Sequence, residues 1–320
     1  MKRWILAAAT LVFTQAAIAQ SGQYPERPIR FIVGLATGGP TDLSARALAA
    51  AASKQLGQPM VVVNIPGAAQ TLAMAELARA PADGYTIAMI TSTYRALTAH
   101  QQKLAFDTND LQTLLGYAEF RHLMFVQSDS RFRTIQDVIR YGKDHPGALT
   151  FGHVGAGSSL QLQGLIFFKG AGVQVTDVPY KGSAEFTNAV LGKQIDLALI
   201  EISGVRALAK AGTARLLVTV TAERFPEFPD VPTAREMGIE GPEYLNPLVG
   251  VAVRRGTPPE IVKRLHDALR RAMENPEFAG AMNQMGLKSG YTSPEAFDAV
   301  IAKAQAHALP LMREVGLVKQ

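Results

Sequence analysis

Residues 29–56 read IRFIVGLATGGPTDLSARALAAAASKQL, a stretch that joins an apolar run, a glycine-rich turn and an alanine-rich helical pattern. Its apolar, β-branched start has the length of a buried strand, and Gly38 and Gly39 then allow a tight turn. Thr41 and Asp42 follow with side-chain oxygens that accept hydrogen bonds from the first amides of a helix. Such a junction directs several N–H groups and the positive end of the helix dipole into one space. The stretch therefore predicts an anion-binding turn.

A second unit of the same kind occupies residues 149–170, LTFGHVGAGSSLQLQGLIFFKG. A short strand leads into Gly155-Ala156-Gly157, and Ser158 and Ser159 supply a helix cap before an apolar helix. Most glycine-rich turns between a strand and a helix only reverse the chain. Two anion-competent turns in the two halves of one chain, however, predict a single ligand that is held from both sides.

The length and the first residues indicate an exported protein with more than one domain. A chain of 320 residues with 48% hydrophobic content has enough apolar side chains for two cores. Lys2 and Arg3 precede an apolar run over residues 4–13, and Ala17-Ile18-Ala19 has the form of a cleavage site. We therefore expect a signal peptide over residues 1–19, cleaved after Ala19. The apolar run is too short to span a bilayer.

Composition and motifs exclude several functional classes. The absence of Cys rules out disulfides, thiolate metal sites and a Cys nucleophile. A net charge of +5 without basic runs, with 7% aromatic residues, gives no support for nucleic-acid binding. The six His residues show no metal-ligand spacing, and no G-x-S-x-G elbow surrounds Ser158 or Ser159. No catalytic residue, metal or cofactor is therefore expected.

Two sharper readings of the second turn compete with simple anion binding. His153 lies beside the turn, where a general base would be useful for a serine nucleophile. Residues 152–160 also resemble a dinucleotide fingerprint, with Asp177 near the position of its acidic residue. Leu160 stands where that fingerprint needs a third glycine, however, and an exported protein rarely meets a free dinucleotide. Both readings are therefore disfavoured.

Strands and helices alternate along the rest of the chain, which is typical of α/β folds with parallel strands. Further strands are predicted at 59–63, 85–90, 123–126, 149–151, 173–178, 195–200, 215–221 and 248–253. Helices are predicted at 71–79, 134–143, 183–191, 260–273, 276–286 and 293–315. Because ligands bind beyond the carboxyl ends of parallel strands, the loops 35–41, 64–70 and 91–94 are the expected binding loops of the first half.

An ordered set of short motifs runs through the chain after residue 23. It comprises Tyr24-Pro25-x-Arg27-Pro28-Ile29, Gly38-Gly39-x-x-Asp42 with Ala45-Arg46, Asn64-x-Pro66-Gly67-Ala68, Asp83-Gly84-Tyr85-Thr86, Gly155-x-Gly157-Ser158, Val178-Pro179-Tyr180-Lys181-Gly182, Gln194-Ile195-Asp196 and Pro229-Asp230-Val231-Pro232-Thr233. Each motif is weak alone, but the set resembles the Bug family in the family's own order. Bug proteins are the TctC-like periplasmic solute-binding receptors of tripartite tricarboxylate transporters.

The resemblance implies a two-lobed α/β fold of the periplasmic-binding-protein, or Venus-flytrap, type. Each lobe would be a mostly parallel sheet flanked by helices, with the ligand in the cleft between lobes. The expected bounds are 24–122 plus 246–320 for lobe 1 and 123–245 for lobe 2. Strands 123–126 and 248–253 would cross between the lobes and act as the hinge. A monomer is expected.

The resemblance also implies that the loops after the first strand of each lobe hold a ligand carboxylate. Ligand contacts are predicted at Leu35, Thr37, Gly38, Gly39, Thr41, Asp42, Ala68, Ser92, Tyr94, Arg95, Gly155, Ala156, Gly157, Ser158, Ser159, Tyr180 and Glu201. Arg95 would pair with a second carboxylate and Glu201 would accept from an amine or hydroxyl. The alternative for both is a solvated charge at a strand end.

The chain departs from the family pattern near these loops. Gly34-Leu35 replaces the usual Pro-Phe, Thr37 replaces Pro, Ala69-Gln70 replaces Gly-Gly, and Gln161 replaces His. The expected function is periplasmic binding of a di- or tricarboxylate, an acidic amino acid or an aromatic carboxylate, for delivery to a tripartite tricarboxylate-type permease. The alternatives are a ligand-sensing partner of a membrane sensor protein and an exported enzyme that acts on a carboxylate.

Overall fold

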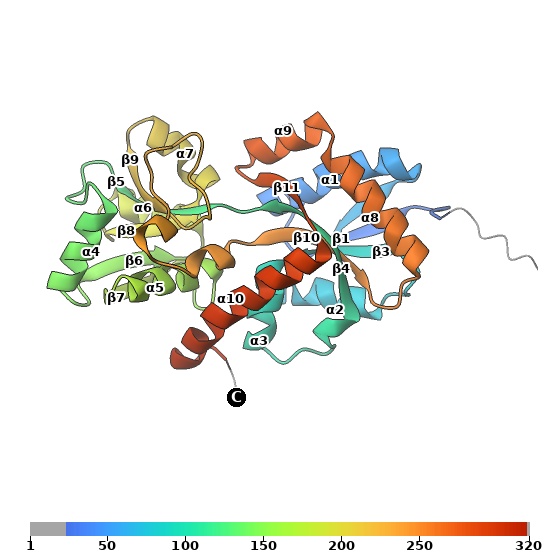
Figure 1. The fold of residues 1–320 in the computed structure, drawn as a ribbon, viewed down its shortest axis with the longest axis horizontal. Helices are drawn as coiled ribbons and strands as arrows, with labels where there is room; N and C mark the ends of the chain where they lie inside the picture. Colours follow the sequence, from blue (N-terminus) through green and yellow to red (C-terminus); the bar gives the residue numbers. More distant parts are fainter. Residues whose placement is uncertain (1–23, 319–320) are drawn as a thin grey trace, which may run out of the picture.

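The computed structural model describes residues 24–318, which form two α/β lobes side by side (Figure 1). One lobe is built on a six-stranded sheet of order β11-β4-β10-β3-β1-β2, and the other on a five-stranded sheet of order β7-β6-β8-β5-β9. The expected signal peptide, residues 1–19, lies outside the described residues. Over residues 24–318, no helix is both long and apolar enough to cross a membrane.

The six-stranded sheet of lobe 1 is covered by helices on both faces. Its strands are β1 (Ile29–Val33), β2 (Met60–Asn64), β3 (Thr86–Thr91), β4 (Leu111–Glu119), β10 (Leu248–Arg254) and β11 (Lys288–Thr292). Its helices are α1 (Pro40–Leu56), α2 (Thr71–Arg79), α3 (Ala99–Gln101), α8 (Pro259–Met273), α9 (Pro276–Gln284) and α10 (Pro294–Glu314). Phe31 and Val33 pack into the core under α1 and α8, whereas Ile32 packs into the core under α2 and α10. This alternation shows why the first strand is apolar throughout.

The five-stranded sheet of lobe 2 has the same layered design. Its strands are β5 (His122–Gln127), β6 (Leu149–His153), β7 (Val175–Pro179), β8 (Leu197–Glu201) and β9 (Ala214–Thr219). Its helices are α4 (Ile135–Asp144), α5 (Ser159–Gly170), α6 (Ser183–Leu191) and α7 (Ile202–Lys210). A Cβ added at Gly164 would lie 2.2 Å from the Phe151 ring, so the bare glycine lets α5 pack closely on β6.

The two-lobed α/β fold is confirmed, and both sheets are mixed. In each sheet three neighbouring strands are parallel, namely β2-β1-β3 and β7-β6-β8. The expectation of mostly parallel sheets was wrong, because the pairs β3-β10, β10-β4, β4-β11, β8-β5 and β5-β9 are antiparallel. The physical reason is that the chain leaves lobe 1 along β4 and returns to it along β10, and both of these strands lie inside the sheet. Neither β4 nor the edge strand β11 was predicted, and the residues of β11 are largely exposed and show no period.

Two short segments connect the lobes. Phe120 and Arg121 join β4 to β5, and residues 246–247 lead back from η5 (Pro242–Leu245) into β10. Val249 pairs with Thr91 at the end of β3, and His122 pairs with Glu201 at the end of β8. The chain therefore crosses at the carboxyl ends of the parallel strands in both lobes. As a result, the loops after β1, β2 and β3 face the loops after β6, β7 and β8.

A buried polar cluster around His122 joins the two crossing segments. The His122 Nδ1 atom lies 2.6 Å from Gln163 Oε1 on α5. The Gln163 amide nitrogen donates to Pro242 O and to Asn246 Oδ1, and His122 N donates to the same Asn246 oxygen. On its other side, His122 Nε2 lies 3.8 Å from the Glu201 carboxylate. Burial is the main effect on this ring and holds the pKa of His122 below its ordinary value.

The pKa of His122 predicts a loss of stability in mild acid. The unfolded chain binds a proton near pH 6.5, whereas the buried ring in the folded protein does not. Stability is therefore complete above that pH and falls as the pH drops below it, by at most about 1.4 kcal/mol per pH unit for one proton. Urea unfolding at pH 7, 6 and 5 measures this slope. His122→Gln is expected to flatten it, whereas His145→Gln, at an exposed position, is not. Equal slopes in all three proteins would contradict the assignment.

Candidate ligand-binding site

The side chain of Asp42 holds the first glycine-rich turn in place by hydrogen bonds. This carboxylate is fully buried and accepts from Gly38 N at 2.9 Å, Arg46 Nε at 3.0 Å and Asn64 Nδ2 at 2.8 Å. The Asn64 amide also donates to Leu35 O, at the start of the turn. Burial acts to raise the pKa of Asp42, but the three hydrogen bonds outweigh it and lower the pKa. Asp42 is thus an internal anion that shapes the turn.

The same turn keeps other amides free. Within residues 24–318, the N–H groups of Thr37 and Gly39 have no hydrogen-bond acceptor. Gly38 has a φ of +90°, which a residue with a side chain rarely adopts. A Cβ added at Gly39 would meet no atom closer than 4.0 Å, so the space beside the turn is open. The sequence expectation of outward-facing amides therefore applies to a part of the turn, because Gly38 N is already bound by Asp42.

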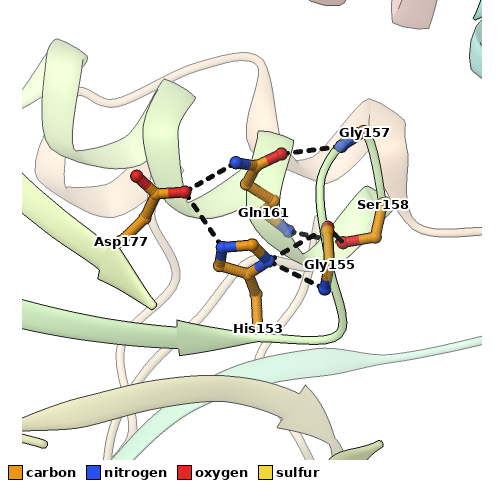
Figure 2. Close-up of polar contacts among 6 residues, drawn as sticks. All are labelled: His153, Gly155, Gly157, Ser158, Gln161 and Asp177. Carbon is orange, nitrogen blue, oxygen red and sulfur yellow. Dashed lines mark hydrogen bonds and ion pairs between the residues drawn. The ribbon is translucent and has the colours of Figure 1, made fainter. Parts of the chain in front are cut away.

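The second glycine-rich turn is held by two side chains, His153 and Gln161, that meet at Asp177 (Figure 2). Asp177 Oδ2 accepts from His153 Nε2 at 2.9 Å and from Gln161 Nε2 at 2.6 Å. The other end of the Gln161 amide accepts from Gly157 N at 2.7 Å, and His153 Nδ1 accepts from Gly155 N at 3.0 Å. Two amides of this turn are therefore bound by the protein itself, as Gly38 N is in the first turn.

Ser158 closes this turn and begins α5. Its hydroxyl donates to Gly155 O at 2.8 Å and accepts from Gln161 N at 3.2 Å, which makes it the helix N-cap that the sequence predicts. Gly155 and Gly157 have φ values of +109° and +75°. Within the described residues, the amides of Ala156 and Ser159 have no acceptor. These two N–H groups are therefore free to donate to a further acceptor.

The structure accounts for His153 and Asp177 without catalysis or a dinucleotide. The His153 ring is 1% exposed, and both of its nitrogens are hydrogen-bonded inside lobe 2. Asp177 is bonded to His153 and Gln161, so its carboxylate positions the turn. Among residues 24–318, no group of three His, Asp or Glu side chains is placed to hold a metal ion.

The lobes touch at the second turn. Gln101 Nε2, at the end of α3 in lobe 1, donates to Gly157 O at 2.9 Å. The neighbouring Gln102 donates to Ala68 O and to the Thr71 hydroxyl, so it ties the loop after β2 to the same place. Neither glutamine was predicted from the sequence, because no local motif surrounds them. Two ion pairs also join the lobes, Lys169 with Glu314 at 2.6 Å and Lys288 with Glu223 at 2.9 Å.

The remaining predicted contacts are divided between the interlobe side and the lobe interiors. The buried Ser92 hydroxyl accepts from Leu248 N, so it supports the return crossing. Arg95 is paired with Asp298 of α10 at 2.6 Å, so its charge is balanced within lobe 1. Glu201 is partly exposed beside His122 at the end of β8, and the half-buried Tyr180 packs edge-on against Phe186.

The fold and these turns agree with a family match. The family model described as the tripartite tricarboxylate transporter family receptor, TctC, matches residues 44–317. The chain belongs to the TctC family. A relative in Cupriavidus necator, known as the UPF0065 protein in the gbd 5' region, is 33% identical over 98% of this chain and 96% of its own length. The recognition of the Bug family from sequence motifs is therefore confirmed.

Solved structures of TctC proteins share this fold. A TctC solute-binding protein from Polaromonas has a TM-score of 0.81 at 27% identity, over 91% of this chain and 99% of that one. A protein from R. palustris solved with adipate has a TM-score of 0.76 at 28% identity, covering 92% and 99%. MatC from Rhodopseudomonas palustris, solved with bound malate, has a TM-score of 0.70 at 27% identity, covering 89% and 100%. The matched family model describes transporter receptors, and the Polaromonas protein is a solute-binding protein.

Proposed function

We propose that the protein binds a small carboxylate-bearing solute between its lobes and delivers it to the membrane permease of a tripartite tricarboxylate transporter. The observation that carries this proposal is the matched design of the two glycine-rich turns. In each, internal side chains bind some of the amides and leave others without an acceptor, at the edges where the lobes face one another. The dicarboxylates held by two family structures, adipate and malate, support a ligand of this class.

The free amides are sufficient for a useful affinity. A hydrogen bond to a charged group contributes about 1.5–3 kcal/mol, so three or four of them approach the roughly 8 kcal/mol of a micromolar complex. The proposed donors are the amides of Thr37, Gly39, Ala156 and Ser159, and Tyr180 and Glu201 are the proposed contacts at the far end of the ligand. Arg95 contributes least to this proposal, because Asp298 already balances its charge.

The proposal includes location and domain organisation. The receptor would act in the periplasm as a monomer after removal of residues 1–19, with lobe 1 over 24–122 and 246–320 and lobe 2 over 123–245. Opening and closing would take place at the two crossing segments, which is the usual hinge motion of such proteins. The His122 cluster would then lie at the hinge.

Thermal melting against a panel of acids tests the proposal. The panel holds aliphatic, amino and aromatic mono- and dicarboxylates, each paired with its uncharged amide as a control. A ligand at 100 times its dissociation constant adds about 2.7 kcal/mol of stability, which is readily seen. We expect a rise in melting temperature with one class of acid and none with its amides. A panel without any shift, or equal shifts for acids and amides, would contradict carboxylate recognition.

A further inference from the structure

The loop after β2 has an unusual backbone. Ala68, Ala69 and Gln70 have φ values of +44°, +48° and +77°, so three successive residues with side chains occupy the left-handed region. Such conformations are costly and persist where the surrounding structure demands them, most often at functional sites. Glycine would adopt these φ values without penalty. Gln70 therefore carries a side chain at a position whose backbone conformation favours glycine.

Gly34, directly after β1, makes room for that side chain. A Cβ added at Gly34 would lie 2.9 Å from Gln70 Cβ and 3.1 Å from Ala73 Cβ. The backbone of Gly34 is not left-handed, so space is the reason for this glycine. The missing side chain at residue 34 and the Gln70 side chain therefore fit together, because any side chain at residue 34 would collide with Gln70.

The Gln70 amide has one end bound and one end free. Its Nε2 donates to Thr91 Oγ1 at 3.2 Å, whereas its Oε1 is buried and has no partner. Turning the amide over only exchanges the two ends, because the Thr91 hydroxyl can either donate or accept. Buried polar groups without a partner are rare in native proteins and indicate a missing water or ligand.

A second unpaired group lies on the next loop. The Tyr94 side chain is 1% exposed, and its hydroxyl makes no hydrogen bond of normal geometry. Burial raises the pKa of this phenol, and a weaker hydrogen-bonding contact with the Thr71 side chain lowers it in part. Thr71 adjoins Gln70 in the chain, and Tyr94 N donates to the same Thr91 hydroxyl that the Gln70 amide contacts.

Both groups lie where the lobes meet. Gln102 binds Ala68 O and the Thr71 hydroxyl, and the adjacent Gln101 binds Gly157 O of the second turn. Gln101 and Gln102, at the end of α3, therefore connect the loop that holds Gln70 to the second glycine-rich turn in lobe 2. Of the four buried side-chain atoms without a partner in residues 24–318, the Gln70 oxygen and the Tyr94 hydroxyl belong to this region.

We propose that Gln70 is a specificity-determining residue whose free amide end, together with the Tyr94 hydroxyl, pairs with a hydroxyl group of the ligand. A hydroxyl both donates and accepts, so it suits either orientation of the amide. A methylene group at that place would leave both protein groups unpaired, and sites built for a hydroxyl reject analogues that lack it. This inference rests on the proposed function and narrows it to hydroxylated carboxylates.

Isothermal titration calorimetry with two matched pairs of acids tests the inference. The pairs are malate with succinate and 2-hydroxyadipate with adipate, whose members differ by one hydroxyl. We expect the better-bound pair to show at least about tenfold tighter binding of the hydroxylated acid. Gln70→Ala removes the amide but keeps the Cβ over Gly34, so it should reduce this ratio to about one by weakening only the hydroxylated acid. Gln55→Ala, at an exposed position of α1, should keep the ratio.

The outcomes separate this inference from the proposed function. Equal affinities within each pair in the wild-type protein, or an unchanged ratio in Gln70→Ala, would overturn the role of Gln70 and leave carboxylate binding intact. Absence of binding of all four acids would overturn the inference of a hydroxylated dicarboxylate, whereas the proposed function is overturned only by the wider melting panel. If Gln70→Ala does not fold, Gln70→Gly replaces it, because glycine adopts the φ of +77° without strain. Tyr94→Phe provides an independent check and should reduce the same ratio.

Discussion

Asp42→Ala is expected to abolish carboxylate binding and to lower the free energy of unfolding by about 3 kcal/mol. The substitution removes the acceptor that Gly38 N, Arg46 and Asn64 share. The first turn then loses the bonds that hold its free amides in place, and the part-buried Gly38 N–H and Asn64 amide lose an acceptor. Urea unfolding gives the stability change, and calorimetry with the acid that stabilises the wild-type protein gives the affinity.

A matched control for Asp42 is Glu76→Ala. Glu76 also pairs with an arginine of lobe 1, Arg30, at 2.7 Å, but both side chains are partly exposed, at 39% for Arg30 and 44% for Glu76. Exposed pairs contribute less than about 1 kcal/mol, so this variant should fold and bind almost as the wild type does. Equal behaviour of the two variants would show that the internal carboxylate of Asp42 does not organise the turn.

The fall of stability in acid should also reveal the contribution of Asp42. Because the folded protein lowers the pKa of Asp42, its stabilising effect is complete above the ordinary value of 3.8. The effect is lost as the pH falls through the lowered pKa of the folded state. Asp42→Ala is therefore expected to lose less stability than the wild type in strong acid, which pH-dependent unfolding measures.

Asp177→Ala is expected to weaken carboxylate binding about 10- to 100-fold, because binding groups that shift by about 1 Å lose that much. Asp177 touches the turn only through His153 and Gln161, whose other ends hold Gly155 N and Gly157 N. Without their shared acceptor, these side chains no longer fix the two amides. Asp177 is thus a positioning residue, and its carboxylate is partly exposed, so the loss of stability should be small.

Hydrogen exchange distinguishes positioning from a general loss of structure. The amides of Gly155 and Gly157 should lose their protection in Asp177→Ala, while those of the β5 strand keep theirs. Asp230→Ala, an exposed carboxylate of the same lobe, serves as the matched control and should leave affinity and exchange unchanged. Retained protection of both glycine amides, or an unchanged affinity, would show that Asp177 is not needed to hold the turn.

Local sequence patterns predicted the parts of the fold that depend on local chemistry. The helix over residues 71–79 has the bounds of α2, and both glycine-rich turns lie between a strand and a helix. Glycines with positive φ, such as Gly38 and Gly157, can be recognised in a sequence because few other residues adopt that backbone conformation. The ordered motifs then identified the family, since they mark turns that the fold needs.

Contacts between residues that lie far apart in the sequence could not be predicted, for physical reasons. The fit between Gly34 and Gln70 depends on how β1 and the loop after β2 lie together, which no local pattern records. Asp177, His153 and Gln161 each had a plausible local interpretation, and only the fold shows that they form one cluster. Arg95 was predicted beside the ligand because it follows β3, but α10 supplies Asp298 from a segment about 200 residues later.

The bond between Gln101 and Gly157 O sets a limit on how tightly any ligand is held. It is made between protein groups of the two lobes, so it favours the shut arrangement of the molecule even before a solute binds. A solute that must enter between the lobes sees only the open share, and its apparent dissociation constant rises in inverse proportion to that share. Residues that do not contact the solute thereby affect the solute concentration at which half of the protein is occupied.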